Sequence, residues 1–289
     1  MSGRTAHVRD GARGFRLYGA AGVPGAPPGT GPRRRVAFVP EPRGIADDMT
    51  SPSETAGDPL ADLDPFAIFD AEAERLDRHL SGLDAEGWER PSRAAGWSVR
   101  DVLGHLAGEE LYNHACLDGD VDGFSVMLRR EGVEGGFDAF NEWCVRRRRD
   151  LPVEEVLREW RRANGETRER MRALGREADL ETLAGPYPVG MQTFHYDAEY
   201  ATHADDVGAP VSPEEADGRA WWRARVAMAV LAEQGSHAQV EPVGERIWVH
   251  VFGTSTEMTL PAFVEATAGR LPEDVPLDRR VRAALRCLA

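Results

Sequence analysis

Three side chains of types that suit a metal ion lie in two helical segments of the sequence. Glu199 and His203 are four residues apart, so one helical turn brings a carboxylate and an imidazole to the same side of their helix. This pair alone is common on solvent-facing helices, where it gives only a modest favourable contact. A third donor from another helix, His105, is what favours a metal site. Two histidines and one carboxylate leave coordination positions open, which suits Zn²⁺ first, with Fe²⁺, Mn²⁺ and Ni²⁺ as alternatives.

His105 is expected to face the interior of the protein because it lies beside an apolar stripe. On a helix, that stripe consists of Val99, Val102, Leu103 and Leu106. The row of His105 continues through Asp101, Glu109 and Tyr112 at spacings of three and four, so that neighbouring side chains can touch. A polar row beside the core can line a cavity.

The second helix also contains alternatives for these roles. His195 lies one turn before Glu199, so a site made of His195 and Glu199 is an alternative. About 12 Å of helix rise, at 1.5 Å per residue, separates His195 from His203, which is too far for both to bind one ion. Tyr196, His195 and Tyr112 are the candidate catalytic residues, and a structural role in a helical bundle is the alternative for each.

Helices must position these side chains. Apolar residues at helical spacing predict a helix that begins near Asp64. Ser98 and Asp101 have the spacing of a capping box, which opens a second helix that runs to about Cys116. The Gly-rich stretch 118–136 is interpreted as a connection.

Two further helical regions follow. Residues 137–174 predict one or two helices with a break at Pro152, because proline cannot continue a helix. A Pro-rich loop then leads into a helix from about Met191 to Val207, which contains Glu199 and His203. The sequence thus predicts a mainly α fold, with an antiparallel four-helix bundle over residues 59–210.

The two ends of the chain differ in character from this bundle. Residues 211–289 predict a small α/β lobe, with a helix at 213–233, paired strands at 246–252 and 256–260, and a helix at 261–269. Residues 1–58 are rich in Gly, Pro and Arg and lack any persistent period, so we expect a disordered N-terminal extension. Met49 is a candidate for the natural start.

Composition narrows the range of partners. The 289 residues carry a net charge of −14, which repels nucleic acid and anionic membranes at long range. All 35 basic residues are Arg, which excludes Schiff-base chemistry and suggests a high-GC bacterial source. Three cysteines at wide spacing indicate a reducing compartment, and no apolar run is long enough for a membrane span. We expect a cytoplasmic monomer or homodimer that acts on a small molecule.

Two stretches resemble a known family. Residues 96–106, GWSVRDVLGHL, and residues 199–208, EYATHADDVG, are similar to the mycothiol-dependent maleylpyruvate isomerase family, a branch of the DinB-like metal-binding bundles. The likeness runs from about Asp64 to Pro210. It implies that His105, Glu199 and His203 bind a divalent metal, usually zinc, and Asn141 matches an asparagine common in these proteins.

The resemblance also implies a reaction class. Family members use the metal to activate a low-molecular-weight thiol, which in actinobacteria is mycothiol. The thiolate can add to a cis double bond and leave, which gives cis-trans isomerisation, or it can remain attached, which gives S-transfer. A thiol-independent metalloenzyme using Lewis-acid or metal-water chemistry, for example in natural-product tailoring, is one alternative. A non-catalytic metal-binding stress protein is another. In the lobe, Arg223, Arg225, Arg246 and Arg270 are candidates to bind an anionic substrate.

Overall fold

The computed structural model describes residues 58–288. The predicted extension over residues 1–58, with its candidate start at Met49, lies outside them except for its last residue. The N-terminal part contains the elements α1 (Pro65–Ser81), α2 (Ala85–Glu89), α3 (Val99–Asp118), α4 (Val121–Arg130), α5 (Phe137–Arg148), α6 (Val153–Leu174), β1 (Asp179–Thr182), β2 (Gly185–Pro188) and α7 (Val189–Val207). The C-terminal part contains α8 (Pro213–Glu233), β3 (Gln239–Val243), β4 (Arg246–Val251), β5 (Thr254–Thr259), α9 (Leu260–Thr267) and α10 (Arg279–Leu285).

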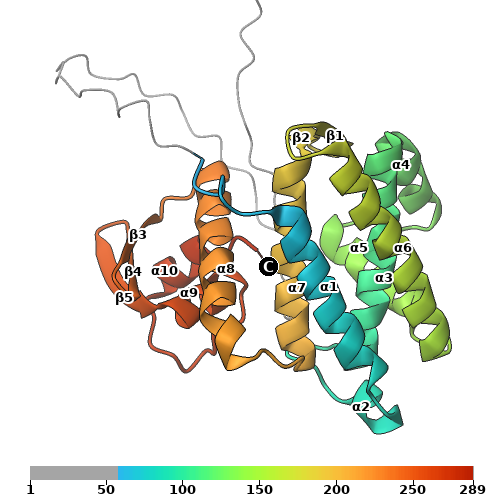
Figure 1. Ribbon diagram of the computed structural model, residues 1–289, viewed down its shortest axis with the longest axis horizontal. Helices are drawn as coiled ribbons and strands as arrows, with labels where there is room; N and C mark the ends of the chain where they lie inside the picture. Colours follow the sequence, from blue (N-terminus) through green and yellow to red (C-terminus); the bar gives the residue numbers. More distant parts are fainter. Residues whose placement is uncertain (1–57, 289) are drawn as a thin grey trace, which may run out of the picture.

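Helices α1, α3, α6 and α7 form a four-helix bundle, and α7 lies on the side of the bundle that faces the C-terminal elements (Figure 1). The mainly α fold with a bundle followed by a small lobe is therefore confirmed. Helices α3 and α6 run in the same direction, since Glu110 contacts Asn164 at 3.0 Å and Asp118 contacts Arg170 at 2.7 Å. Helices α1 and α7 are also parallel to each other.

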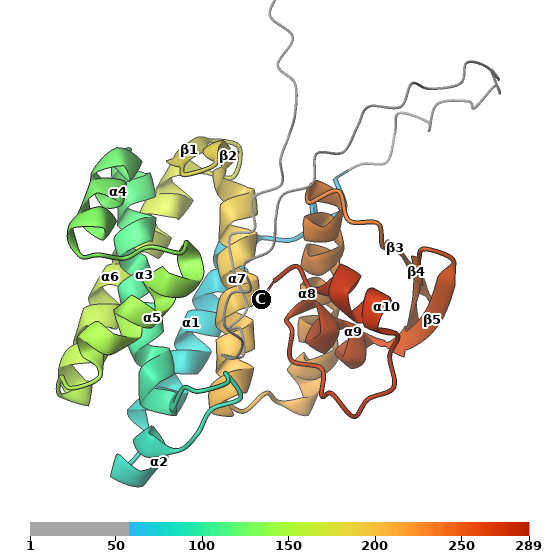
Figure 2. The ribbon, with the colours of Figure 1, turned by 180° about the vertical axis from the view of Figure 1, so that it is seen from behind.

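The pair α3 and α6 runs antiparallel to the pair α1 and α7. Arg161 of α6 bonds to Asp77 near the end of α1, whereas Arg172 bonds to Asp70 nearer its start. In the sequence, residues 118–136 were interpreted as a connection between two helical regions. The chain instead returns from the end of α3 to the start of α6 through α4 and α5, which lie on the outer side of α3 (Figure 2).

A buried hydrogen-bond network lies inside the apolar core of the bundle. The carboxyl group of Glu110, 2% exposed, accepts from Asn164 at 3.0 Å, Thr167 at 2.5 Å and Tyr200 at 3.1 Å. The indole of Trp160 in turn donates to the Tyr200 hydroxyl at 3.0 Å. Because a buried polar group is costly unless it is paired, this network ties α3, α6 and α7 into one arrangement.

Two glycines allow α5 to pack closely on α3. Gly104 and Gly108 are one turn apart and face α5. A Cβ atom at Gly108 would lie 2.3 Å from Cβ of Cys144, closer than real atoms approach. The missing side chain at this position therefore sets the distance between the two helices.

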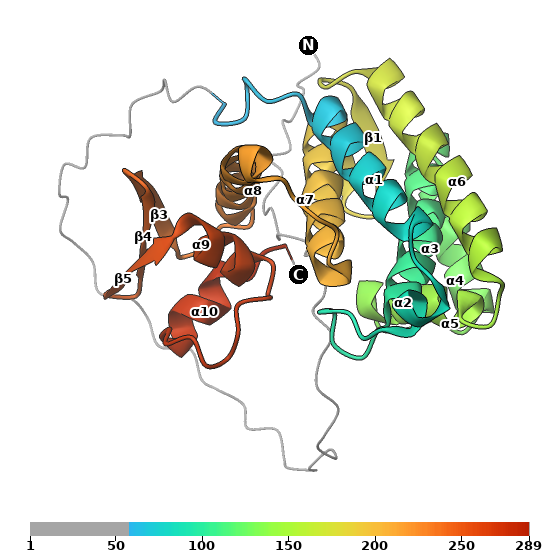
Figure 3. The same cartoon turned by 60° about the horizontal axis from the view of Figure 1, so that its bottom comes forward.

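The C-terminal lobe is a three-stranded antiparallel sheet with helices on one side. The strands have the order β3-β4-β5, and alternate residues of β4 are buried. Ile247, Val249 and Val251 pack toward α8, α9 and α10, which lie between the sheet and the bundle (Figure 3). The predicted strand pair is confirmed in β4 and β5.

Buried ion pairs join the lobe to the bundle. Arg219 of α8 donates to Glu72 of α1 and to Asp205 of α7, at 2.8 Å each. Arg223 bonds to the second oxygen of Asp205 at 2.5 Å. These contacts fix α8 against α1 and α7.

Several short elements were not predicted. Helix α4 lies within the Gly-rich stretch that was interpreted as a connection, and the hairpin β1-β2 forms much of the Pro-rich loop. Both segments lack the length that makes a periodic pattern readable. Among residues 58–288, no helix combines the length and apolarity needed to cross a lipid bilayer.

Candidate metal centre

The three predicted metal-ligand side chains converge between α3 and α7. Nε2 of His105 lies 2.9 Å from Oε1 of Glu199, and Nε2 of His203 lies 3.9 Å from the same oxygen. One donor atom from each of the three residues lies within 4.8 Å of the others, and all three side chains are buried. The structure thus brings together His105, from one helix, with the i, i+4 pair Glu199 and His203 of another.

A carboxylate of the same helix, itself held by an arginine of the lobe, orients His203. Its Nδ1 lies 3.1 Å from Oδ2 of Asp206, so Nδ1–H can donate to that carboxylate and leave the Nε2 lone pair directed at Glu199. Arg270 of the lobe holds both oxygens of Asp206 at 2.8 Å. Burial would raise the pKa of Asp206, but its contacts with His203 and Arg270 outweigh that effect and hold its pKa well below the usual value.

Trp97 covers the two histidine rings. Its ring centre lies 5.1 Å from that of His105 and 6.4 Å from that of His203, with the second pair stacked. Its indole N–H donates to Glu142 at 3.2 Å, which fixes the ring. The tryptophan in the motif therefore packs against two of the candidate ligands.

The charges in the centre favour cation binding. Burial lowers the pKa of His105, so its imidazole is neutral and has a lone pair to offer. Burial would raise the pKa of Glu199, but its hydrogen bond with His105, together with the nearby imidazoles of His105 and His203, holds it below its ordinary value. Glu109 differs, because burial and the neighbouring charge of Glu199 raise its pKa well above the ordinary value.

The donors fit a divalent ion. The second oxygen of Glu199, Oε2, is buried and has no hydrogen-bond partner among the described residues. Such a group is costly to leave unpaired, and a cation beside it would remove the cost. Two imidazoles and one carboxylate form a ligand set that borderline divalent metals prefer.

Two of the candidate catalytic residues lie close to this centre. Tyr196 and Tyr112 line a small cavity of about 10 Å³ together with Glu109 and Asn141. The hydroxyl of Tyr196 is buried without a partner within residues 58–288, whereas that of Tyr112 accepts from the backbone N–H of Leu183 at 3.3 Å. Burial raises the pKa of Tyr196 well above its ordinary value, so its hydroxyl stays protonated.

The third candidate, His195, lies elsewhere. Its Nε2 is 3.1 Å from the hydroxyl of Tyr187 and 3.6 Å from a carboxylate oxygen of Glu233. Its ring therefore faces β2 and α8, and the alternative site of His195 with Glu199 is not formed.

The remaining chemistry-bearing residues are engaged in other contacts. Burial raises the pKa of Cys116 to about 11, so this thiol is a poor nucleophile at neutral pH. Each of the four lobe arginines predicted for an anionic substrate bonds to a carboxylate of the chain itself: Arg223 to Asp205, Arg225 to Asp62, Arg246 to Glu257 and Arg270 to Asp206. Arg270 was predicted from the sequence as a candidate substrate ligand. In the structure, Arg270 instead binds Asp206, the residue that contacts His203.

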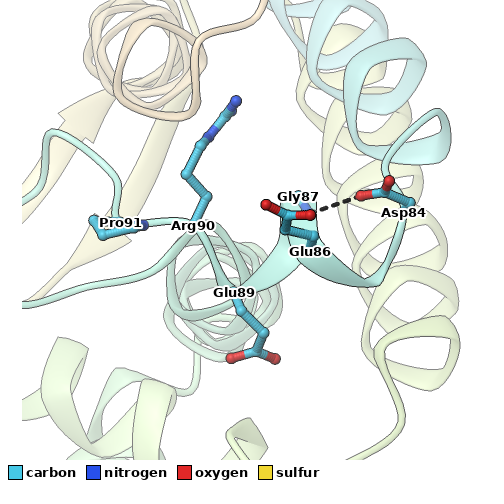
Figure 4. A pocket seen from close by; sticks show the side chains of 6 residues that line it. All are labelled: Asp84, Glu86, Gly87, Glu89, Arg90 and Pro91. Atoms are coloured by element: carbon cyan, nitrogen blue, oxygen red, sulfur yellow. Dashed lines mark hydrogen bonds between the residues drawn. The ribbon is translucent and has the colours of Figure 1, made fainter.

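A separate surface hollow of about 460 Å³ lies at α2 and contains none of the predicted site residues (Figure 4). It is lined by Asp84, Glu86 and Glu89 with Arg90. Asp84 is used as a helix cap, since it accepts from the N–H of Gly87 at 2.8 Å. The side chains of Asp84 and Glu89 point in different directions, so the carboxylates do not converge on one point.

Comparison with known proteins supplies one family match. The model of the mycothiol maleylpyruvate isomerase N-terminal domain matches residues 69–208, a range that contains all three converging donors. An uncharacterized protein of Mycobacterium tuberculosis, strain CDC 1551 / Oshkosh, is 27% identical over 118 residues, which are 40% of this chain and 44% of that protein. An uncharacterized protein of strain ATCC 25618 / H37Rv gives the same values. The chain thus spans less than half the length of these two curated relatives.

Two solved structures are similar at low identity. The crystal structure of the mycothiol-dependent maleylpyruvate isomerase aligns with a TM-score of 0.47 and 16% sequence identity, over 73% of this chain and 89% of that chain. A mutant of that enzyme aligns with a TM-score of 0.46 and 15% identity, over 71% and 88% of the two chains.

Proposed function

Because residues 69–208 belong to the mycothiol maleylpyruvate isomerase N-terminal domain family, we propose that this chain is a metal- and mycothiol-dependent enzyme. It acts on a small electrophilic metabolite, as a cis-trans isomerase or as a thiol S-transferase. The observation that carries the proposal is the convergence of His105, Glu199 and His203 from two helices, with one buried oxygen of Glu199 lacking any partner among the described residues.

His105, Glu199 and His203 would hold the ion, with zinc as the first candidate. When bound, a divalent cation lowers the pKa of a coordinated thiol, so that the thiolate nucleophile is present at neutral pH. Glu199 supplies the negative charge of the site because its pKa is held low. Neutral His105 and the oriented Nε2 of His203 supply the lone pairs.

The surrounding residues exclude water and limit the charge. Trp97 packs over both imidazole rings, which keeps solvent from that side of the centre. Glu109 carries a raised pKa and holds its proton, so it adds no second negative charge beside Glu199. The protonated Tyr196 hydroxyl is a donor that a substrate oxygen or a water molecule can use.

Metal analysis of the purified protein tests the site. We expect one divalent ion per chain in the wild type and loss of that ion in His105→Ala and Glu199→Ala. His195→Ala is the matched control, because His195 is also a buried histidine of the bundle but contacts Tyr187. A metal-free wild type, or normal metal content in both ligand variants, would refute the assignment.

Titration with mycothiol tests the thiol. The metal-loaded protein should bind mycothiol, and the metal-depleted protein should bind it much more weakly. A metal-loaded protein that does not bind mycothiol would contradict the thiol proposal and would favour direct metal-water or Lewis-acid chemistry.

A further inference from the structure

A pocket in the C-terminal lobe shares no residue with the metal centre. Its volume is about 450 Å³, within the range of small-molecule sites. Three separate segments line it: the end of α8 with the loop after it, the turn between β4 and β5, and helix α10 with the residues that follow. The lining residues are Gln234, Ser236, His237, Phe252, Arg280, Ala283, Ala284 and Arg286.

The charge of this pocket is opposite to that of the whole chain. Its lining contains two arginines and a histidine but no carboxylate, although the chain has a net charge of −14. Within residues 58–288, no carboxylate lies within ion-pairing distance of the Arg280 guanidinium, unlike the four lobe arginines described above. Guanidinium groups match carboxylate and phosphate oxygens in charge and geometry. The pocket is thus suited to an anion.

The pocket floor is held in place by hydrogen bonds. The hydroxyl of Ser236 donates to the backbone oxygen of Ala284 at 3.0 Å, and the side chain of Gln234 donates to the backbone oxygen of Cys287 at 3.2 Å. These contacts connect the residues that follow α8 to α10 and to the residues that follow α10. Arg280 of α10 and Arg286, which follows the helix, therefore lie on a fixed support, which reduces the entropy lost when a ligand binds.

Phe252 forms an aromatic wall in a conformation that few side chains adopt. It has a φ of +46°, and no other non-glycine residue between 58 and 288 has a positive φ. The residue is 63% exposed, and its ring centre lies 4.9 Å from that of His237. Strained residues of this kind concentrate at ligand sites, and an exposed ring at the pocket edge offers a surface for a planar ligand.

We propose that this pocket is a second small-molecule site, which binds a planar organic anion. The carboxylate or phosphate group lies between Arg280 and Arg286, and the ring of the ligand lies against Phe252. The ligand class follows from the pairing of cationic and aromatic walls in one pocket. The site is independent of the metal centre and of the chemistry proposed there.

Calorimetric titration of the full chain with phenyl phosphate tests the proposal, because this probe carries both an anion and a planar ring. We expect saturable binding to the wild type and about tenfold weaker binding to Arg280→Gln, since a charged hydrogen bond is lost. Arg279→Gln is the matched control: it removes the same charge from the neighbouring position of α10, which does not line the pocket.

Two further variants separate the parts of the site. Phe252→Asn keeps the backbone conformation, because Asn tolerates positive φ, and it should weaken the binding of phenyl phosphate more than that of inorganic phosphate. His105→Ala should bind phenyl phosphate as the wild type does, because it affects only the metal centre. Both Arg280 and Phe252 are exposed, so these changes leave the lobe folded.

Three outcomes would overturn the proposal. The first is the absence of saturable binding to the wild type at millimolar phenyl phosphate. The second is an equal loss in Arg279→Gln and Arg280→Gln, which would indicate general attraction to positive charge. The third is loss of binding in His105→Ala with retention in Arg280→Gln, which would locate the anion at the metal centre.

Discussion

Arg270 of the lobe holds both carboxylate oxygens of Asp206 in the bundle, at 2.8 Å each. The same carboxylate lies 3.1 Å from Nδ1 of His203, so the two bonds join the lobe to a proposed metal ligand. A nearby ion pair between Arg93 and Glu265 connects the same parts of the chain. The position of the lobe is thereby coupled to the orientation of an imidazole in the bundle.

We predict that Arg270→Ala lowers metal affinity about 10- to 100-fold, the usual effect of removing a partner behind a ligand. Asp206 then loses the group that fixes it, and the ring of His203 is less restricted. Competition with a chelator of known affinity measures the change. Arg246→Ala is the control, because Arg246 bonds to the half-exposed Glu257 of the outer sheet. Equal affinities in Arg270→Ala and the wild type would show that the contact does not support the ligand.

We predict a pH-dependent gain in stability for Asp197→Asn. Asp197 is fully buried, and neither carboxylate oxygen has a hydrogen-bond partner in the described chain. Burial, and then the charges of Glu72, Asp64 and Asp70, raise its pKa well above the ordinary value. Since the folded pKa exceeds the unfolded pKa, the wild type loses stability as pH rises from the unfolded value through the folded value.

The asparagine side chain of the Asp197→Asn variant does not titrate, so the variant escapes this loss. The free energy of unfolding of the variant minus that of the wild type should therefore increase as pH rises. The slope of the difference is at most about 1.4 kcal/mol per pH unit for one proton. Urea unfolding of both proteins at a series of pH values measures this slope. The series runs from about pH 4 to about pH 9, which is roughly the range over which a buried carboxyl group titrates. A difference that stays constant with pH, or falls, would refute the prediction.

Gly108→Ala should destabilise the protein by about 1–3 kcal/mol, the usual cost of overpacking a core. The new methyl group would meet Cys144 and Arg148 of α5, so the two helices must move apart. Gly165→Ala is a matched control within α6, where nothing lies within 4 Å of the added atom. It should stabilise the protein by about 0.5–1 kcal/mol, since Ala favours helix more than Gly does. Thermal unfolding distinguishes the two signs, and similar effects from both substitutions would contradict the packing argument.

Thr167→Val should lower the free energy of unfolding by about 1–3 kcal/mol. The substitution keeps the shape of the side chain but removes the hydroxyl that donates to Glu110 at 2.5 Å. The buried Glu110 carboxyl group then loses the Thr167 donor, and no water molecule replaces it. Its other hydrogen-bond donors remain. Chemical denaturation measures the loss, and an unchanged midpoint would show that the remaining donors compensate.

The candidate metal ligands could be predicted from the sequence because helical geometry is local. A spacing of four residues places Glu199 and His203 on one side of α7, and the apolar stripe of α3 places His105 next to the core. The capping box of Ser98 and Asp101 was also readable, and the structure contains both of its hydrogen bonds. What those patterns could not supply was the distance between the two helices.

Other features depend on contacts between residues far apart in the chain. Glu110 has the sequence context of an ordinary helix-surface glutamate, but α6 and α7 bury it and supply three hydrogen-bond donors to its carboxyl group. Arg270 and Asp206 are 64 residues apart in the sequence, and no local sequence pattern predicts that they pair. The two parallel helix pairs likewise follow from the passage of the chain through α4 and α5.

Local sequence patterns were sufficient to predict the long helices, the faces that their polar residues occupy, and the three side chains suited to a metal. Long-range packing was needed to show that His195 faces away from those side chains, that Arg270 supports one of them, and that three segments of the lobe line a cationic pocket. This difference reflects the range of the forces involved. Helix formation and side-chain periodicity act over a few residues, whereas burial and ion pairing depend on which elements pack together.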